Sequence, residues 1–201
     1  MSLALPHPAY TDEPLFRLTV EQYHELIQSG KLTADAPVEL LEGLLVYQMP
    51  KNTPHATATR LCRRVIEPLL PTGWFYDSQE PITLPDGEPE PDGMVVRGQI
   101  EDYTRSHPGP GDVALVIEVA DTTLDRDLGL KLRSYARAEV PIYWVLDLLS
   151  LTLHVFSNPD PFAPEPAYRR HEQFHIGEHV PLSVAGQHVG QITVASLFPP
   201  P

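Results

Sequence analysis

The sequence predicts one α/β domain in which apolar strands alternate with amphipathic helices. The pattern is clearest in residues 113–147, where an apolar strand, a helix and a second apolar strand follow one another. The chain has 201 residues, 42% of them hydrophobic, so one domain with a sizeable core is expected. No internal repeat or long linker divides it. We therefore expect an extended, proline-rich N-terminal arm over residues 1–16 and a single domain over residues 17–198.

The composition excludes several classes of protein. The net charge of −13 argues against a whole surface that binds nucleic acid, although a local basic patch remains open and some of the carboxylates could hold a metal ion. The single cysteine, Cys62, excludes a disulfide framework and a cysteine-rich zinc site. There is no apolar run of about 18 residues and no signal-peptide pattern, so we expect a cytoplasmic protein without membrane association.

Helix and turn signals place the elements of the first half. Thr19 is typical of an N-cap and Gly30 of a helix stop, which predicts a helix through Ser29. The other elements expected before residue 113 are a hairpin of Val38–Leu41 and Leu44–Gln48, a helix over 55–70, and strands over 74–79, 81–84 and 94–96.

The second half is predicted to contain more strands. A strand over 113–119, a helix over 125–138 and a strand over 142–147 come first. Beyond them we expect strands over 151–156, 168–174, 179–184 and 187–194, with a proline-rich loop over 157–167.

Glu118 is the first candidate for chemistry because it interrupts the apolar strand Val113–Val119. A continuous apolar run is typical of a strand that is buried on both faces. A carboxylate buried there is costly unless it is paired or bound to a metal. The alternative is a glutamate at the strand end that reaches solvent.

Lys131 is the second candidate because it falls within the apolar stripe of its predicted helix. At about 100° per residue, it lies beside Leu128 and Tyr135. It could reach Glu118 at the strand end or pair with Asp127 one turn earlier. The alternative is a lysine whose stem is buried and whose ammonium reaches solvent.

Asp92 completes the set, although it could also be a turn aspartate after Pro91. Two carboxylates at adjacent strand ends and a lysine are suited to metal-assisted hydrolysis of phosphodiesters. Hard oxygen ligands favour Mg²⁺, which would polarise the phosphate and lower the pKa of an attacking water. The lysine would orient that water or stabilise the charge of the transition state.

The motifs PDGMVV, LVIEVADTT and DLGLKLRSYARAEVPIYWVLD resemble the Uma family of putative restriction endonucleases, a branch of the PD-(D/E)XK nuclease superfamily. The upstream segment VELLEGLLVYQMPKNTPHATATRL resembles the same family, and the resemblance covers about residues 15–198. It implies a restriction-endonuclease-like mixed central sheet flanked by helices in αβββαβ order. The N-terminal helix and hairpin and the C-terminal strands would be additions to that core.

The resemblance also implies roles for individual residues. By position, Asp92 and Glu118 resemble the two acidic residues of the motif and would bind the metal, with the carbonyl of Val119 as an extra ligand. The sequence departs from the motif at Ala120, where a lysine is usual. The resemblance implies that Lys131 fills that space from the helix.

Three accessory residues and one alternative metal site are weaker candidates. Glu42 could be a turn residue and His55 the first residue of a helix, but the resemblance places His55 near the site, with Asp127 and Glu42 as further accessory candidates. His171, His175 and His179 are spaced by four residues, but their strand-like flanks argue against a helical zinc pair.

The predicted function is therefore that of a Mg²⁺-dependent endonuclease acting on DNA, with Mn²⁺ as a substitute metal. The alternatives are a catalytically inactive nuclease-fold protein that binds nucleic acid or a protein partner, and a metal-dependent hydrolase of another substrate. A homodimer is expected because two sites cut two strands, and Leu130, Leu148 and Leu149 are candidates for its interface.

Overall fold

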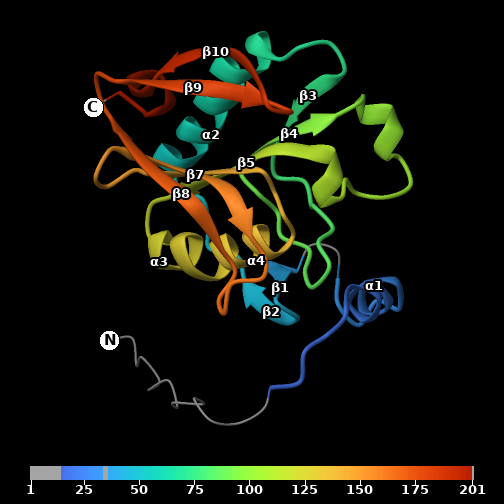
Figure 1. The fold of residues 1–201 in the computed structure, drawn as a ribbon. Coiled ribbons are helices and arrows are strands. Elements are labelled where there is room, and N and C mark those ends of the chain that lie inside the picture. Colours follow the sequence, from blue (N-terminus) through green and yellow to red (C-terminus); the bar gives the residue numbers. More distant parts are fainter. Residues whose placement is uncertain (1–14, 34–35, 201) are drawn as a thin grey trace, which may run out of the picture.

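A mixed six-stranded sheet runs through the centre of the structure, in the order β3-β4-β5-β6-β7-β8 (Figure 1). The structure is a computed structural model that describes residues 15–33 and 36–200, so most of the predicted arm over residues 1–16 lies outside the described residues. Only β5 and β6 are parallel, and all other neighbours are antiparallel. The strands are β3 (Trp74–Asp77), β4 (Gly93–Arg97), β5 (Val113–Ala120), β6 (Ile142–Asp147), β7 (Thr152–Asp160) and β8 (Ala167–His175).

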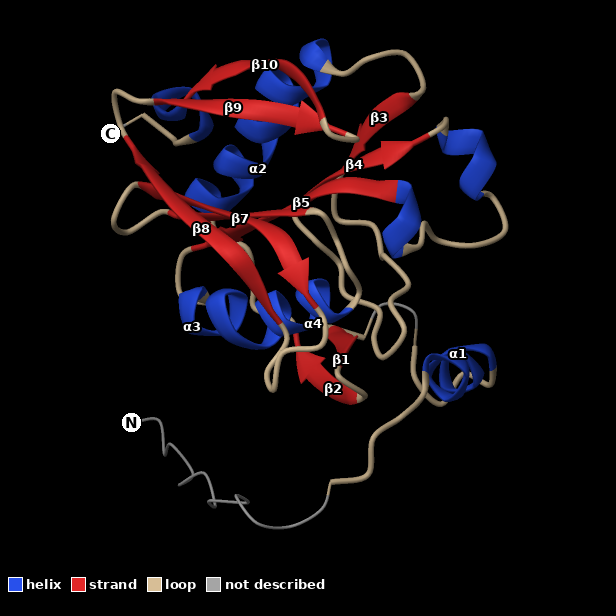
Figure 2. Ribbon diagram, in the orientation of Figure 1, coloured by secondary structure: helices blue, strands red, loops and turns tan. Residues whose placement is uncertain are grey.

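Helices and hairpins cover both faces of this sheet (Figure 2). Helix α2 (Thr53–Ile66) and the hairpin of β9 (His179–Val184) and β10 (Gln187–Thr193) pack on one face. Helix α4 (Leu132–Arg137) packs on the other. The predicted fold class, a mixed sheet flanked by helices, is confirmed, and so is the αβββαβ order from α2 to β6.

The N-terminal additions lie beside this core. Helix α1 (Val20–Gln28) begins at a capping box formed by Thr19 and Gln22, as the sequence indicates. Strands β1 (Val38–Leu41) and β2 (Leu44–Tyr47) form the predicted hairpin. Its turn residues, Glu42 and Gly43, have φ of 48° and 75°, which explains the glycine.

Strand β5 is buried along its whole length. It pairs with β4 and β6, and side chains from α2 and α4 cover its two faces. This double burial accounts for its apolar sequence. It also means that Glu118 is buried and does not reach solvent at the strand end, which excludes one of the alternatives.

Helix α2 differs from its predicted bounds at both ends. It begins two residues earlier because the Asn52 side chain accepts a hydrogen bond from the His55 N–H at 3.0 Å and so caps the helix. It ends at Ile66 and continues as a 3₁₀ turn, Glu67–Leu69, around Pro68, which lacks a backbone donor.

The helix predicted over 125–138 contains an irregularity that the sequence does not signal. It consists of α3 (Leu124–Arg126), a π-helical segment (Asp127–Lys131) and α4. A π turn adds a residue to the regular helical repeat and so rotates the side chains around it. Asp127 and Lys131 are both buried within this segment.

Two predictions for loops and strands were wrong. The segment Pro81–Leu84 forms no strand, because its backbone donors go to three separate carbonyls, those of Pro89, Pro108 and Gly87, instead of a ladder. The proline-rich loop predicted over 157–167 is shorter, since β7 extends to Asp160. Among the described residues, no helix is long and apolar enough to cross a membrane.

Candidate active site

An acidic cavity of about 60 Å³ lies at the carboxyl end of β5. We call it the acidic recess. Its titratable lining residues are Glu39, Lys51, His55, Glu90, Asp92, Glu118, Asp121, Arg126, Asp127 and Lys131. The six carboxylates outnumber the three lysine and arginine side chains in this set by three. The recess therefore has an excess of negative charge that favours a cation.

Asp92 enters the recess from the residue just before β4, and it is 5% exposed. Its Oδ2 accepts a hydrogen bond from the Val119 N–H at 2.9 Å and lies 3.0 Å from Nε2 of His55. Burial raises the pKa of Asp92, but the hydrogen bond and charge of His55, with smaller contributions from Lys131 and Val119, outweigh burial and lower the pKa overall. Asp92 is therefore held as a carboxylate.

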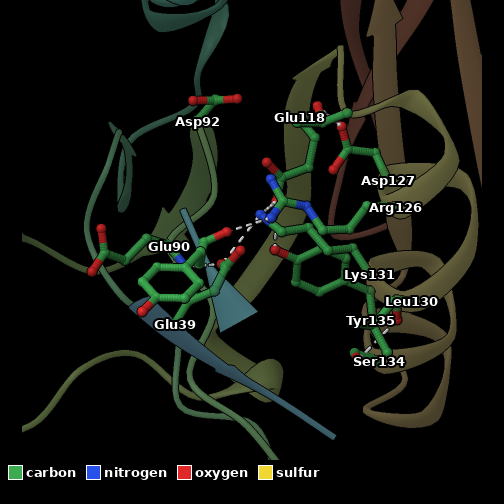
Figure 3. Close-up of polar contacts among 12 residues, drawn as sticks. Glu39, Glu90, Asp92, Glu118, Arg126, Asp127, Leu130, Lys131, Ser134 and Tyr135 are labelled. Atoms are coloured by element: carbon green, nitrogen blue, oxygen red, sulfur yellow. Dashed lines mark hydrogen bonds and ion pairs between the residues drawn. The ribbon is translucent and has the colours of Figure 1, made fainter. Parts of the chain in front are cut away.

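Glu118 enters from β5 on the face that α4 covers, and it is 3% exposed. Its Oε1 accepts hydrogen bonds from Nζ of Lys131 and from the Tyr135 hydroxyl, both at 2.8 Å (Figure 3). Burial raises the pKa of Glu118 to about 8. The charge of Lys131 opposes this shift, whereas Asp92 and other carboxylates reinforce it. A cation bound beside Glu118 would therefore favour its ionised form.

Lys131 lies between two carboxylates from different parts of the chain (Figure 3). Its Nζ is 2.8 Å from Oε1 of Glu118 and 3.3 Å from Oε2 of Glu39 on β1. Burial lowers the pKa of Lys131, but the charges of Glu118 and Glu39 outweigh burial and raise it. The side chain is 4% exposed, so the ammonium does not reach bulk solvent. It is a fixed buried cation, which suits charge stabilisation better than proton abstraction.

The structure places two of the accessory candidates in the recess and one outside it. His55 contacts Asp92, and Asp127 accepts a hydrogen bond from the Thr123 hydroxyl at 2.6 Å. Asp127 makes no ion pair with Lys131 among the described residues, so of the two partners left open for Lys131 the structure shows the contact with Glu118. Glu42 does not line the recess; it lies beside Arg133 and Arg137 on α4.

Sequence reasoning missed several residues of the recess. Glu39 carried a signal, because it interrupts the apolar strand Val38–Leu41 just as Glu118 interrupts β5. Lys51 carried none, yet its Nζ is 3.6 Å from Oδ1 of Asp92. Arg126 also carried none, since its side chain is held by the carbonyl of Tyr47 in the hairpin.

The histidines considered for zinc lie far along the chain from this site. His171 is paired with His154, whose Nδ1 lies 3.0 Å from its Nε2, and His175 contacts the Thr152 hydroxyl at 3.3 Å. Within residues 15–33 and 36–200, no three histidine, cysteine, aspartate or glutamate side chains are grouped closely enough to hold a metal by themselves.

The fold is that of a putative nuclease. The chain is similar to the crystal structure of a putative nuclease of the DUF820 group from Anabaena variabilis ATCC 29413, with a TM-score of 0.61 and 18% sequence identity. The match covers 90% of this chain and 97% of that one, and at this identity it shows the fold alone.

The family follows from the sequence comparison. The Uma2 family model, described as putative restriction endonuclease, matches residues 20–194, so the chain belongs to this family. The resemblance noted from the motifs is thereby confirmed. No curated protein matches the chain.

Proposed function

We propose that this chain is a Mg²⁺-dependent endonuclease that hydrolyses DNA phosphodiester bonds at the acidic recess. Membership of a family of putative restriction endonucleases supports the nuclease activity. One observation carries the site assignment: Asp92 and Glu118, from the adjacent strand regions β4 and β5, line one cavity with the buried ammonium of Lys131.

The donor set fits a hard divalent cation. Mg²⁺ prefers oxygen ligands and keeps several waters, so it is bound through one or two carboxylates and needs no cage of protein side chains. Asp92, Glu118 and the carbonyl of Val119 would hold it, and Mn²⁺ would substitute. When bound, the metal would polarise the phosphate and lower the pKa of the attacking water.

The protein's own residues prepare this chemistry. His55 and the Val119 N–H hold Asp92 in place and ionised. Lys131 and Tyr135 fix Oε1 of Glu118, while the other oxygen of this carboxylate accepts no hydrogen bond from the described residues. Lys131 also supplies a positive charge that can stabilise charge developing on the phosphate.

Cleavage of supercoiled plasmid DNA by the purified protein tests the proposal. We expect nicking and linearisation that require Mg²⁺ or Mn²⁺ and that are lost in Asp92→Asn and Glu118→Gln. Glu101→Gln is the matched control, since Glu101 is an exposed acid outside the recess. Equal cleavage by the wild type and both site variants would show a contaminating nuclease and refute the assignment.

A catalytically inactive nuclease-fold protein that binds nucleic acid or a protein partner is the second candidate. The engagement of Glu118 by Lys131 and Tyr135 favours it, because a metal has to compete with these donors. The net charge of −13 also favours its protein-binding form, because this charge argues against a whole surface that binds nucleic acid. Calorimetric titration with Mg²⁺ and Mn²⁺ separates the two: a folded protein that binds neither ion is not a metal-dependent nuclease.

The predicted homodimer remains a proposal. Leu149 is 76% exposed, whereas Leu130 and Leu148 are only partly exposed. Sedimentation of the wild type and of Leu149→Ser tests whether this surface joins two copies: the dimer is expected to dissociate in the variant. A wild type that sediments as a monomer contradicts the proposal.

A further inference from the structure

Among the residues that the structure describes, Arg126 is the one arginine that lines the acidic recess. Its contacts differ from those of Arg133 and Arg137 on the same helical stretch. Arg133 and Arg137 form ion pairs with Glu42, and Arg137 also pairs with Asp86. Arg126 forms no ion pair with a carboxylate of the described residues, although six carboxylates line the recess. Its charge is therefore not neutralised by a direct ion pair with any described residue.

The guanidinium of Arg126 is nevertheless held in place. Its Nη1 donates a hydrogen bond to the carbonyl of Tyr47 at 2.8 Å, at the end of β2. Its Nε is buried and makes no hydrogen bond to any described residue. Figure 3 shows the side chain extending from the helix, and it lines the recess together with Glu118 and Lys131.

This arrangement leaves a specific set of donors available. The Nη1 group that is used lies on one side of the guanidinium, while the Nε–H and one N–H of Nη2 point in parallel from the other edge. Such an edge matches two oxygens of a phosphate or a carboxylate. A buried donor without a partner is unfavourable, so a ligand that supplies the acceptor is bound more tightly.

Lys51 provides a second positive charge at the same recess. Its side chain is 36% exposed, and its Nζ lies 3.6 Å from Oδ1 of Asp92. It belongs to the segment that joins β2 to α2, and the contact of Arg126 with Tyr47 ties the start of that segment to α3. A phosphate is more suitable here than a free carboxylate, because a nucleic-acid backbone carries several phosphates past one site.

We propose that Arg126, assisted by Lys51, binds the non-bridging oxygens of a nucleic-acid phosphate at the acidic recess. The inference deepens the proposed nuclease function and rests on it for the identity of the ligand. Arg126 is assigned as a substrate-binding residue: it fixes the position of the backbone, while the metal and Lys131 are left to act on the reacting phosphate.

Equilibrium binding of a fluorescent DNA duplex in EDTA, over a salt series from about 50 to 200 mM, tests this proposal without cleavage. Arg126→Gln keeps a donor for the Tyr47 carbonyl but removes the charge and the parallel donors. We expect a loss of affinity of about 10- to 100-fold and a decrease of about 0.9 in the slope of log affinity against log salt. Arg126→Lys keeps the charge and is expected to lose less affinity with an unchanged slope.

The matched control is Arg105→Gln. Arg105 is exposed and precedes β5, whereas the recess lies at the carboxyl end of that strand, so this variant is expected to bind as the wild type does. Identical affinity and slope in the wild type and Arg126→Gln overturn the proposal. A loss of affinity with an unchanged slope in Arg126→Gln also overturns it, because Arg126 then acts only as a tether. A wild type that does not bind DNA overturns it as well.

The outcome can be separated from that of the proposed function by measuring cleavage in Mg²⁺. If the wild type cleaves DNA and Arg126→Gln has the same KM, the nuclease function stands and the role of Arg126 is refuted. If the wild type binds DNA through Arg126 but neither binds Mg²⁺ nor cleaves, the nuclease function is refuted and the phosphate contact stands.

Discussion

Replacement of Lys131 by methionine tests whether the charge at the centre of the recess stabilises the fold. Methionine keeps an unbranched side chain of similar length but leaves Glu118 and Glu39 buried without their shared cation. Removing one partner of a buried ion pair costs about 3–5 kcal/mol of the free energy of unfolding. We expect a loss of this size at high pH, where Glu118 is ionised.

The loss is expected to depend on pH in a defined direction. The folded-state pKa of Glu118 is about 8, above its ordinary value of 4.5, and burial is the main cause. A raised pKa means that the folded state holds the proton more tightly, so the stability contribution is fully present below about pH 4.5 and is lost as the pH rises through about 8. At about pH 5 Glu118 carries a proton in both proteins, so the methionine variant should lose less stability there than at about pH 9.

Urea denaturation at both pH values measures this difference. Lys51→Met is the control, because Lys51 lies at the same recess but is 36% exposed and 3.6 Å from its partner carboxylate. Its free energy of unfolding should change by no more than about 1 kcal/mol at either pH. If Lys131→Met loses as much stability at low pH as at high pH, the effect is one of packing and the electrostatic argument fails.

Three further changes test the fold around the site. Gly93→Ala places a Cβ on the Tyr76 hydroxyl, so it should lower the free energy of unfolding by about 1–3 kcal/mol in a urea denaturation assay. Gly111→Ala is the control, because a Cβ at Gly111 lies in open space and should have little effect. Thr19→Ala removes the cap of α1 and should cost about 1 kcal/mol, seen as faster hydrogen exchange in that helix alone. Arg137→Gln breaks two partly exposed ion pairs. It should lower the free energy of unfolding by less than about 1 kcal/mol per pair and leave the calorimetric binding of Mg²⁺ unchanged. Weaker Mg²⁺ binding would place these pairs in the site.

The sequence was most informative where one element is buried on both faces. The run Val113–Val119 predicts a central strand because only double burial explains continuous apolar character, and the same reasoning makes Glu118 an exception that needs a partner. Helical periodicity then places Lys131 on the face that meets this strand, and the structure shows the contact.

The remaining parts of the site depend on tertiary packing. Glu39 meets Lys131 only because the β1–β2 hairpin lies beside the π-helical segment, and no local pattern predicts that packing. Arg126 is directed by the carbonyl of Tyr47, a backbone acceptor that any residue would supply. The pairing considered between Asp127 and Lys131 assumed a regular helix, whereas a π-helical segment joins these two residues.

The position of Ala120 connects these observations. Side chains two residues apart on a strand point to the same face, so Ala120 shares the face of Glu118, and its methyl group is fully buried in the core beside α4. A lysine at 120 would have to occupy this packed space, whereas Lys131 brings its ammonium to Glu118 from the helix. The small residue on the strand and the buried lysine on the helix are therefore compatible with each other.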